Sequence, residues 1–163
     1  GYKNVDSLLR AFAKLLRREK RKFKLVIVGR GHDYPRLVAL AEKLGITGLI
    51  EWKYSLSRQQ LLSEYAKASV FVSLSSLESF GRAIYEAVMI GVPTVVLNVG
   101  SAANLVNAGV AIGAESVDSD EIADKIQVAI RGAKPRARSI PYAFLSWEEY
   151  VDRILRIYHN VAE

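Results

Sequence analysis

The chain contains no cysteine and only two histidines, His32 and His159, which lie far apart in the sequence. It can therefore form no disulfide bond and no thiolate metal site, and the histidines lack the spacing of a metal-ligand pair. No stretch approaches the roughly 20 consecutive apolar residues that a membrane-spanning helix needs. The first residues, Gly1 to Val5, do not look like a secretion signal. These absences favour a cytoplasmic protein without a metal site.

The composition fits one compact domain with an excess of positive charge. The chain has 163 residues, of which 50% are hydrophobic, and a formal net charge of +6. Basic residues gather at 14–24 and 131–138. Such an excess suits phosphorylated ligands, an anionic membrane surface or nucleic acid, and charge alone does not choose among them. Because the first cluster ends an amphipathic helix, we interpret it as a solvated face, with peripheral contact at the inner face of the membrane as the alternative. We expect no nucleic-acid partner.

Apolar residues at helical spacing alternate along the chain with short β-branched runs. The pattern predicts strands over 25–28, 49–52, 70–74, 94–97 and 110–112. It predicts helices over 5–16, 37–44, 61–65, 83–90, 102–107 and 122–130, then a basic linker over 131–139 and a closing helix capped by Ser146. Serial strand and helix units whose strands are apolar on both faces predict an α/β fold, a Rossmann-like parallel sheet with helices on both faces.

The most informative segment is the run ESFGRAIYE at residues 78–86, followed by Gly91-Val92-Pro93. It places Glu78 and Glu86 around a glycine turn and the start of a helix. Because Glu78 follows a strand, it should lie at the carboxyl edge of the sheet, where open α/β folds bind ligands. The helix N-terminus offers free N–H groups and a positive dipole to phosphate oxygens, while carboxylates accept hydrogen bonds from sugar hydroxyls.

At these residues the chain resembles the retaining GT-B glycosyltransferases of the family 4 type, glycosyl transferases group 1, whose signature is Glu, seven residues, Glu. The resemblance implies the C-terminal, donor-binding half of a GT-B fold, with residues 1–163 forming one nucleotide-sugar-binding domain. It also implies a fragment that lacks the N-terminal acceptor domain and the first donor-domain strand. The parent enzyme would transfer a hexosyl group from a nucleoside-diphosphate sugar to an acceptor sugar or lipid-linked saccharide. It would need no metal, and the fragment alone should hardly turn over.

The resemblance assigns roles to individual residues. Glu78 is the catalytic residue, which contacts the hexose and stabilises charge rather than acting as a nucleophile, and Glu86 receives both ribose hydroxyls. Lys3 neutralises the diphosphate of the leaving group. The remaining expected donor-binding residues are those of the turn and helix start (Ser79, Phe80, Gly81, Arg82, Ala83), of the glycine loop (Gly29, Arg30, Gly31) and of the region near the base (Tyr54, Leu56).

Each assignment has an ordinary structural alternative. Glu78 could simply favour a helix N-terminus, and Glu86 could pair with Arg82 four residues earlier, a contact worth roughly 0.2–0.5 kcal/mol. Lys3 could be a solvated lysine, and Gly29 with Gly31 could only shape a turn.

Three other functions compete with the glycosyltransferase interpretation. A noncatalytic Rossmann-like module for binding or regulation would keep the fold without the chemistry. A nicotinamide-binding domain would need a third glycine where Tyr34 stands and an acid about 20 residues further on. A glycosidase would also place two carboxylates across a sugar, but its acids need not frame a helix beside a Rossmann sheet.

Overall fold

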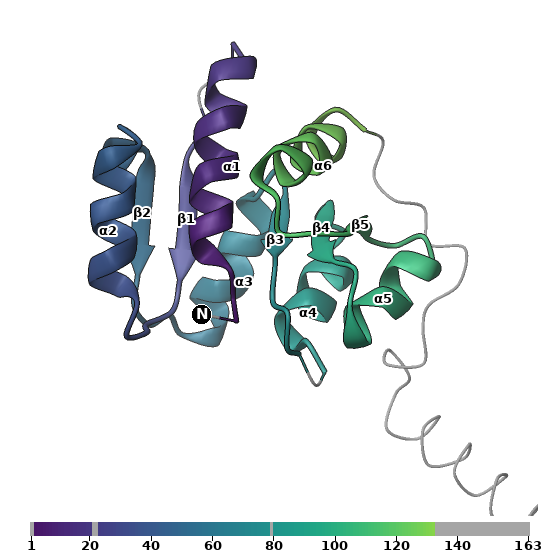
Figure 1. The fold of residues 1–163 in the computed structure, drawn as a ribbon. Coiled ribbons are helices and arrows are strands. Elements are labelled where there is room, and N and C mark those ends of the chain that lie inside the picture. The colour runs from purple at the N-terminus through teal and green to yellow at the C-terminus, as the bar shows by residue number, and fades with distance from the viewer. Residues whose placement is uncertain (1, 21–22, 79, 133–163) are drawn as a thin grey trace, which may run out of the picture.

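The computed structural model describes residues 2–20, 23–78 and 80–132 (Figure 1). The strands are β1 (Leu25–Val28), β2 (Ile50–Lys53), β3 (Phe71–Ser73), β4 (Thr94–Leu97) and β5 (Ile112–Ala114). The helices are α1 (Val5–Arg18), α2 (Tyr34–Lys43), the 3₁₀ helix η1 (Thr47–Leu49), α3 (Arg58–Lys67), α4 (Arg82–Ile90), α5 (Gly100–Asn107) and α6 (Ser119–Arg131). The predicted alternation of helices and strands is confirmed over these ranges.

The strands form two parallel sheets. One contains β1 and β2, and the other contains β3, β4 and β5 with β4 in the middle. Parallel pairing needs a crossover between successive strands, and here helices supply the crossovers. The prediction of an α/β fold built on parallel strands is therefore correct. In the described part of the chain, however, β1 and β3 do not pair with each other, so the strands form two sheets rather than one.

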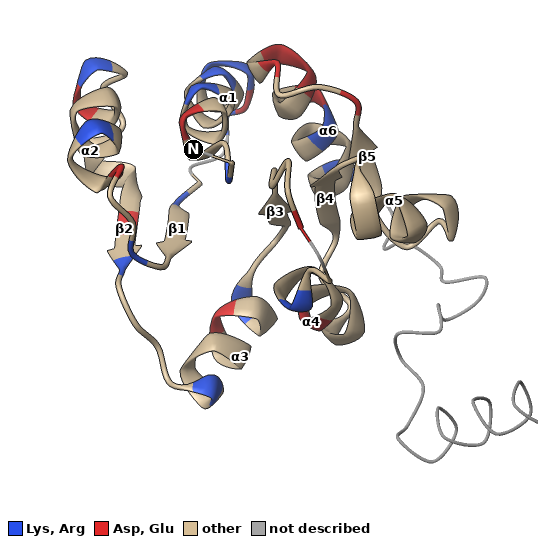
Figure 2. Cartoon of the chain, turned by 60° about the horizontal axis from the view of Figure 1, so that its bottom comes forward, with Lys and Arg blue, Asp and Glu red and all other residues tan. Residues whose placement is uncertain are grey.

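Helices cover both faces of the three-stranded sheet. All four residues of β4 are buried. Val95 packs in a cluster with residues of α1 and α6, whereas Val96 packs with residues of α4 and α5. Because neighbouring side chains of a strand point to opposite faces, these two clusters are the two halves of one core. Figure 2 shows the same layers, with α1 and α6 on one side of the strands and α4 on the other.

The two-stranded sheet is covered differently. Leu25 and Ile27 of β1 pack in the cluster that α1 and α2 form over it. Val26 and Val28 point to the opposite face and keep 36% and 41% of their surface exposed. The run 25–28 is apolar on both faces, as predicted, but the described residues bury only one of them.

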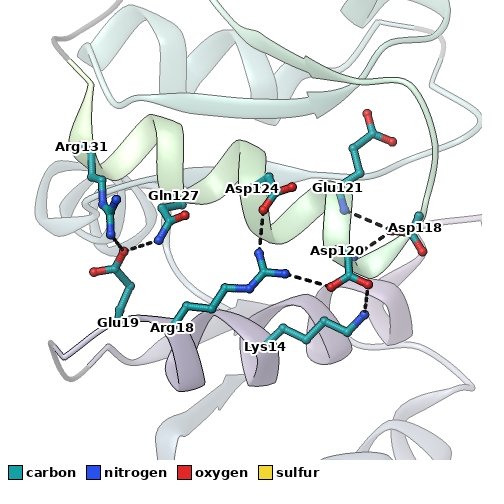
Figure 3. A network of polar contacts seen from close by, with 9 residues as sticks. All are labelled: Lys14, Arg18, Glu19, Asp118, Asp120, Glu121, Asp124, Gln127 and Arg131. Atoms are coloured by element: carbon teal, nitrogen blue, oxygen red, sulfur yellow. Dashed lines mark hydrogen bonds and ion pairs between the residues drawn. The ribbon is translucent and has the colours of Figure 1, made fainter.

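Polar contacts join α1 to α6, the two helices that cover one face of the three-stranded sheet (Figure 3). Asp120 of α6 accepts from Lys14 at 2.5 Å and from Arg18 at 2.9 Å, and Arg18 also donates to Asp124 at 2.6 Å. At the end of α1, Glu19 accepts from α6 side chains Gln127 and Arg131. Lys14 and Arg18 thus stay partly exposed, as a solvated face implies, and also pair with acids of α6 that the α1 sequence could not reveal.

The last predicted strand is displaced by two residues. Val110 and Ala111, expected in a strand, instead close the turn after α5, since both of their N–H groups donate to Leu105 O. Their side chains are buried against α4 and α5, which explains the apolar signal. The predicted linker beyond residue 132 and the closing helix at Ser146 lie outside the described residues. Across the described ranges, no helix has both the length and the apolar character that crossing a bilayer requires.

We expect Ile122→Ala to lower the free energy of unfolding by about 2–5 kcal/mol, because truncating a buried side chain removes apolar burial and leaves a cavity. Ile122 is fully buried between α6, α1 and β4. Val128→Ala on the same helix is the matched control, since Val128 is 56% exposed and should change stability by no more than about 0.5 kcal/mol. Urea denaturation of both variants measures the difference. Equal losses would contradict the described packing of α6.

Candidate functional site

A short segment before α1 is held against the end of β3. The backbone N–H and the hydroxyl of Ser76 both donate to Tyr2 O, at 2.8 and 3.1 Å. The side chain of Asn4 donates to Leu74 O at 2.8 Å. Asn4 has φ +50°, a left-handed conformation that asparagine tolerates better than most residues. These contacts bring the two ends of a long stretch of sequence together at the carboxyl edge of β3.

This arrangement brings Lys3 into contact with Glu78. The Lys3 ammonium donates to Glu78 Oε2 at 2.7 Å, and the Glu78 side chain is only 21% exposed. The hydrogen bond from Lys3 lowers the pKa of Glu78, and the charge of Lys3, the Ser75 hydroxyl and the Gly81 N–H lower it further against the opposing effect of partial burial. Glu78 is therefore ionised at neutral pH, and the predicted catalytic acid and diphosphate-binding lysine lie together.

The turn that follows Glu78 begins α4, as predicted. Gly81 has φ +79°, and a Cβ there would lie 3.0 Å from Ile84 Cδ1 and 3.2 Å from Glu78 Cγ. Arg82 and Ala83 are the exposed first residues of α4. Because the first N–H groups of a helix have no partner within it, this end can serve an anion. Ser79 lies outside the described residues.

Two neighbouring contacts fix the turn before α4. The Phe80 ring stacks on Tyr85, with centroids 4.9 Å apart and an interplanar angle of 14°. Ser101 at the start of α5 donates its hydroxyl to Phe80 O at 3.1 Å. Phe80 nevertheless keeps 53% of its surface exposed. The turn is thus held from inside the fold while one face of its aromatic ring stays accessible.

Glu86, in the second turn of α4, is held mainly by α3. Arg58 donates to Oε1 at 2.8 Å and the Tyr65 hydroxyl donates to Oε2 at 3.4 Å. The expected partner Arg82 lies further away, with its Nε 4.0 Å from Oε1. The Glu86 side chain is 11% exposed. Burial of Tyr65, together with the charge of Glu86 and their hydrogen bond, raises the pKa of Tyr65 to about 12.

The loops after β1 and β2, together with the start of α2, line a cavity of about 430 Å³ formed by Arg30, Gly31, Tyr34, Pro35 and Tyr54. The Arg30 guanidinium lies 5.9 Å from the centroid of the Tyr54 ring, and the Tyr34 and Tyr54 rings meet edge to face at 5.3 Å. A hydrogen bond with Tyr54 raises the pKa of Tyr34. An arginine and aromatic rings around an open cavity suit a flat, aromatic ligand.

Two expected residues of these loops do not line the cavity. Gly29 has φ +129° and donates its N–H to Lys53 O at 2.8 Å, so it forms the turn that leaves β1. This structural role was the alternative foreseen for the glycine loop. Leu56 is partly buried and is not among the residues that line the cavity.

The expected residues therefore form three contact groups rather than one continuous site. Lys3 contacts Glu78, Glu86 contacts α3, and Arg30 contacts Tyr54. All three groups follow the carboxyl ends of parallel strands, the edge at which open α/β sheets bind ligands. Among the described residues, no group of three acidic or histidine side chains is arranged to hold a metal ion.

Sequence reasoning missed Arg58 and Tyr65, which contact Glu86, and Tyr34 and Pro35, which line the cavity. A local signal existed for the first pair. Ser57 and Gln60 form a capping box, a recognisable pattern that marks Arg58 as the first residue of α3. Residues seven apart then lie on one face of a helix. No local pattern indicated that this face meets Glu86.

Comparison with known proteins gives consistent results. The family described as Glycosyl transferases group 1 matches residues 1–145. The chain is 30% identical to D-inositol 3-phosphate glycosyltransferase 1 of Catenulispora acidiphila, over 99% of this chain and 42% of that protein. It therefore spans less than half the length of this curated relative.

Two solved structures share the fold. A glycosyltransferase from Rickettsia africae superposes with a TM-score of 0.77 at 23% identity, over 100% of this chain and 45% of that one. Alr3699/HepE from Anabaena, in complex with UDP and glucose, superposes with a TM-score of 0.69 at 25% identity, over 80% of this chain and 36% of that one. The α/β fold described above is thus that of one half of a GT-B glycosyltransferase.

We expect Gly81→Ala to destabilise the protein more than Gly91→Ala. Both glycines have a left-handed φ, +79° and +82°, at the two ends of α4, so an alanine at either costs about 1–2 kcal/mol of backbone energy. Only at Gly81 does the new methyl group meet neighbours, Ile84 and Glu78. Chemical denaturation of the two variants isolates that extra cost. Equal destabilisation would mean that the side chains of Ile84 and Glu78 move aside for the methyl group without cost.

Proposed function

The chain belongs to the glycosyl transferases group 1 family, and on that premise we propose that it is the donor-binding domain of a retaining glycosyltransferase. It binds a nucleoside-diphosphate sugar, and the parent enzyme transfers the hexosyl group to an acceptor sugar or lipid-linked saccharide. The observation that carries this proposal is the contact of Lys3 with Glu78 beside the N-terminus of α4. A cation, an ionised carboxylate and a helix N-terminus are the groups that a sugar diphosphate needs.

The chemistry follows from the charges in this group. Departure of the nucleoside diphosphate develops negative charge on phosphate oxygens, and a lysine with a helix N-terminus stabilises that charge in place. The Lys3 ammonium has three donors, so it can contact a phosphate oxygen while keeping Glu78. Glu78, held ionised and turned toward Lys3, positions sugar hydroxyls rather than attacking carbon. The donor's own phosphate oxygen assists the acceptor on the same face, and no metal cofactor is required.

The other two groups suit the nucleoside. Glu86 accepts hydrogen bonds from both ribose hydroxyls, and the cavity between Arg30 and Tyr54 holds the base. We place the protein in the cytoplasm. Exposed basic residues of α1, such as Arg10 and Arg17, are compatible with peripheral contact to a membrane that carries a lipid-linked acceptor.

Isothermal titration with UDP, GDP, ADP and their sugars tests donor binding. We expect one nucleotide to bind at micromolar to millimolar concentration. Glu86→Gln should weaken its binding about tenfold or more, because the amide has only one acceptor oxygen where the carboxylate has two. Glu42→Gln, on the exposed side of α2, is the control and should bind like the unaltered protein. A folded protein that binds none of these nucleotides at millimolar concentration would instead favour a noncatalytic module.

We further propose that in the full-length enzyme an acceptor domain and one more strand precede this chain. The N–H of Gly29, just after β1, donates to Lys53 of β2, and the N–H of Phe71 in β3 donates to Pro93 just before β4. Because N–H groups alternate in direction along a strand, those of Val26 and Val28 point to the edge of β1 away from β2, and that of Val72 points to the edge of β3 away from β4. Helix α1 packs against both sheets, so we place the additional strand under α1, between the free edges of β1 and β3. The bond from Ser76 N–H to Tyr2 O has the form of the last rung of a parallel ladder.

An N-terminal extension tests this strand. We expect five β-branched residues fused before Gly1 to raise the melting temperature by several degrees, because they would pair with both open edges. A Gly-Ser extension of equal length is the control. Amide hydrogen exchange should slow at Val26, Val28 and Val72 only with the β-branched extension. Identical melting and exchange for the two extensions would contradict the strand.

A further inference from the structure

Helix α3 presents two donors to the carboxylate of Glu86. Arg58 and Tyr65 lie seven residues apart, which places them on one face of the helix. Arg58 donates to Oε1 and Tyr65 to Oε2, so each oxygen of Glu86 has its own partner from the same helix. Two donors on two different oxygens fix both the position and the rotation of the carboxylate.

Both donors come from well-defined parts of the fold. Tyr65 is 6% exposed, and its ring meets Phe71 edge to face at 5.5 Å within the cluster that includes Ala87 of α4. Its hydroxyl therefore has little freedom. Arg58 is the first residue of α3, whose start is set by the capping box of Ser57 and Gln60. Although the Arg58 side chain is 69% exposed, its guanidinium covers a carboxylate that is 11% exposed.

The hydrogen-bonding capacity of Glu86 matches a vicinal diol. An ionised carboxylate has about four acceptor positions, two on each oxygen. Arg58 and Tyr65 use one on each oxygen, while Arg82 at 4.0 Å is too distant for a hydrogen bond. One position on each oxygen is then left, and a vicinal diol offers two hydroxyl donors that can fill them.

We infer that Arg58 and Tyr65 are positioning residues that set the recognition of the nucleotide's ribose, by holding Glu86 so that its two remaining acceptor positions meet the 2′- and 3′-hydroxyls. This inference rests on the proposed function, in which Glu86 binds the ribose. It assigns α3 to the donor site. Tyr54, which lines the cavity proposed for the base, lies in the loop directly before α3.

The test compares the nucleotide that binds best with its 2′,3′-dideoxy analogue, by isothermal titration. We expect Tyr65→Phe and Arg58→Met each to weaken ribonucleotide binding roughly 3- to 10-fold, the range for one lost hydrogen bond, and to leave dideoxynucleotide binding unchanged. Arg58→Lys should restore part of the loss. Lys67→Met, which removes a cation from the far end of the same helix, is the control and should alter neither affinity.

A second measurement needs no nucleotide. Burial is the main cause of the raised pKa of about 12 at Tyr65 and the charge of Glu86 adds to it, so Glu86→Gln should lower that pKa. A spectroscopic phenol titration, with Tyr65→Phe as the reference that identifies this residue among the eight tyrosines, measures the change. An unchanged pKa would overturn the contact on which the inference depends.

The binding results separate the two proposals. If the unaltered protein binds no nucleotide, the proposed function fails. If it binds ribonucleotides and dideoxynucleotides equally, the assignment of Glu86 to the ribose fails. If it prefers ribonucleotides but Tyr65→Phe and Arg58→Met keep that preference, or if Arg58→Met binds more tightly, then α3 does not position the acid and the inference is overturned.

Discussion

The candidate site depends on the attachment of the segment before α1 to the end of β3. Hydrogen bonds from Ser76 and Asn4 hold this segment in place, with Lys3 Nζ 2.7 Å from Glu78 Oε2, 75 residues away in sequence. The same attachment fixes where α1 begins, and α1 contributes to the cores over both sheets. One set of contacts to backbone carbonyls thus anchors the helix that packs over both sheets and places a lysine beside a carboxylate.

The fold was predictable because its signals are local. Strand β4 is apolar at every position, and helices such as α6 carry apolar residues at regular helical spacing, so each element could be identified without its partners. Errors arose where burial does not imply regular structure. Val110 and Ala111 are buried in a turn, and an apolar signal cannot distinguish a turn from a strand. The separation of the strands into two sheets depends on which strands pair with each other, and the periodicity of apolar residues carries no information about pairing.

The site was only partly predictable for a related reason. Glu78, Gly81 and the start of α4 are neighbours in sequence, so one motif contained their arrangement. The partners of Glu86 come from α3, which precedes β3 in the chain whereas α4 follows it. A carboxylate on a helix surface can pair with any of several nearby cations. The i, i+4 rule favoured Arg82, yet Arg58 is nearer, since a helix packed alongside can direct a guanidinium at the acid. A rule based on spacing within one helix can identify partners on that helix, but it cannot identify partners that another helix supplies.

The two acids differ in how a ligand can use them. Neither ion pair is buried, because the Arg58 side chain is 69% exposed and the Lys3 side chain is 50% exposed, and exposed pairs contribute little stability. Glu86 has a second donor in the hydroxyl of Tyr65, which is 6% exposed, so this buried side chain helps to hold the orientation of the carboxylate. Glu78 is paired with the flexible side chain of Lys3. In the proposed function, Lys3 contacts a phosphate as charge develops while Tyr65 helps to hold Glu86 for the ribose, so one carboxylate keeps its orientation and the other belongs to an ion pair that can adjust.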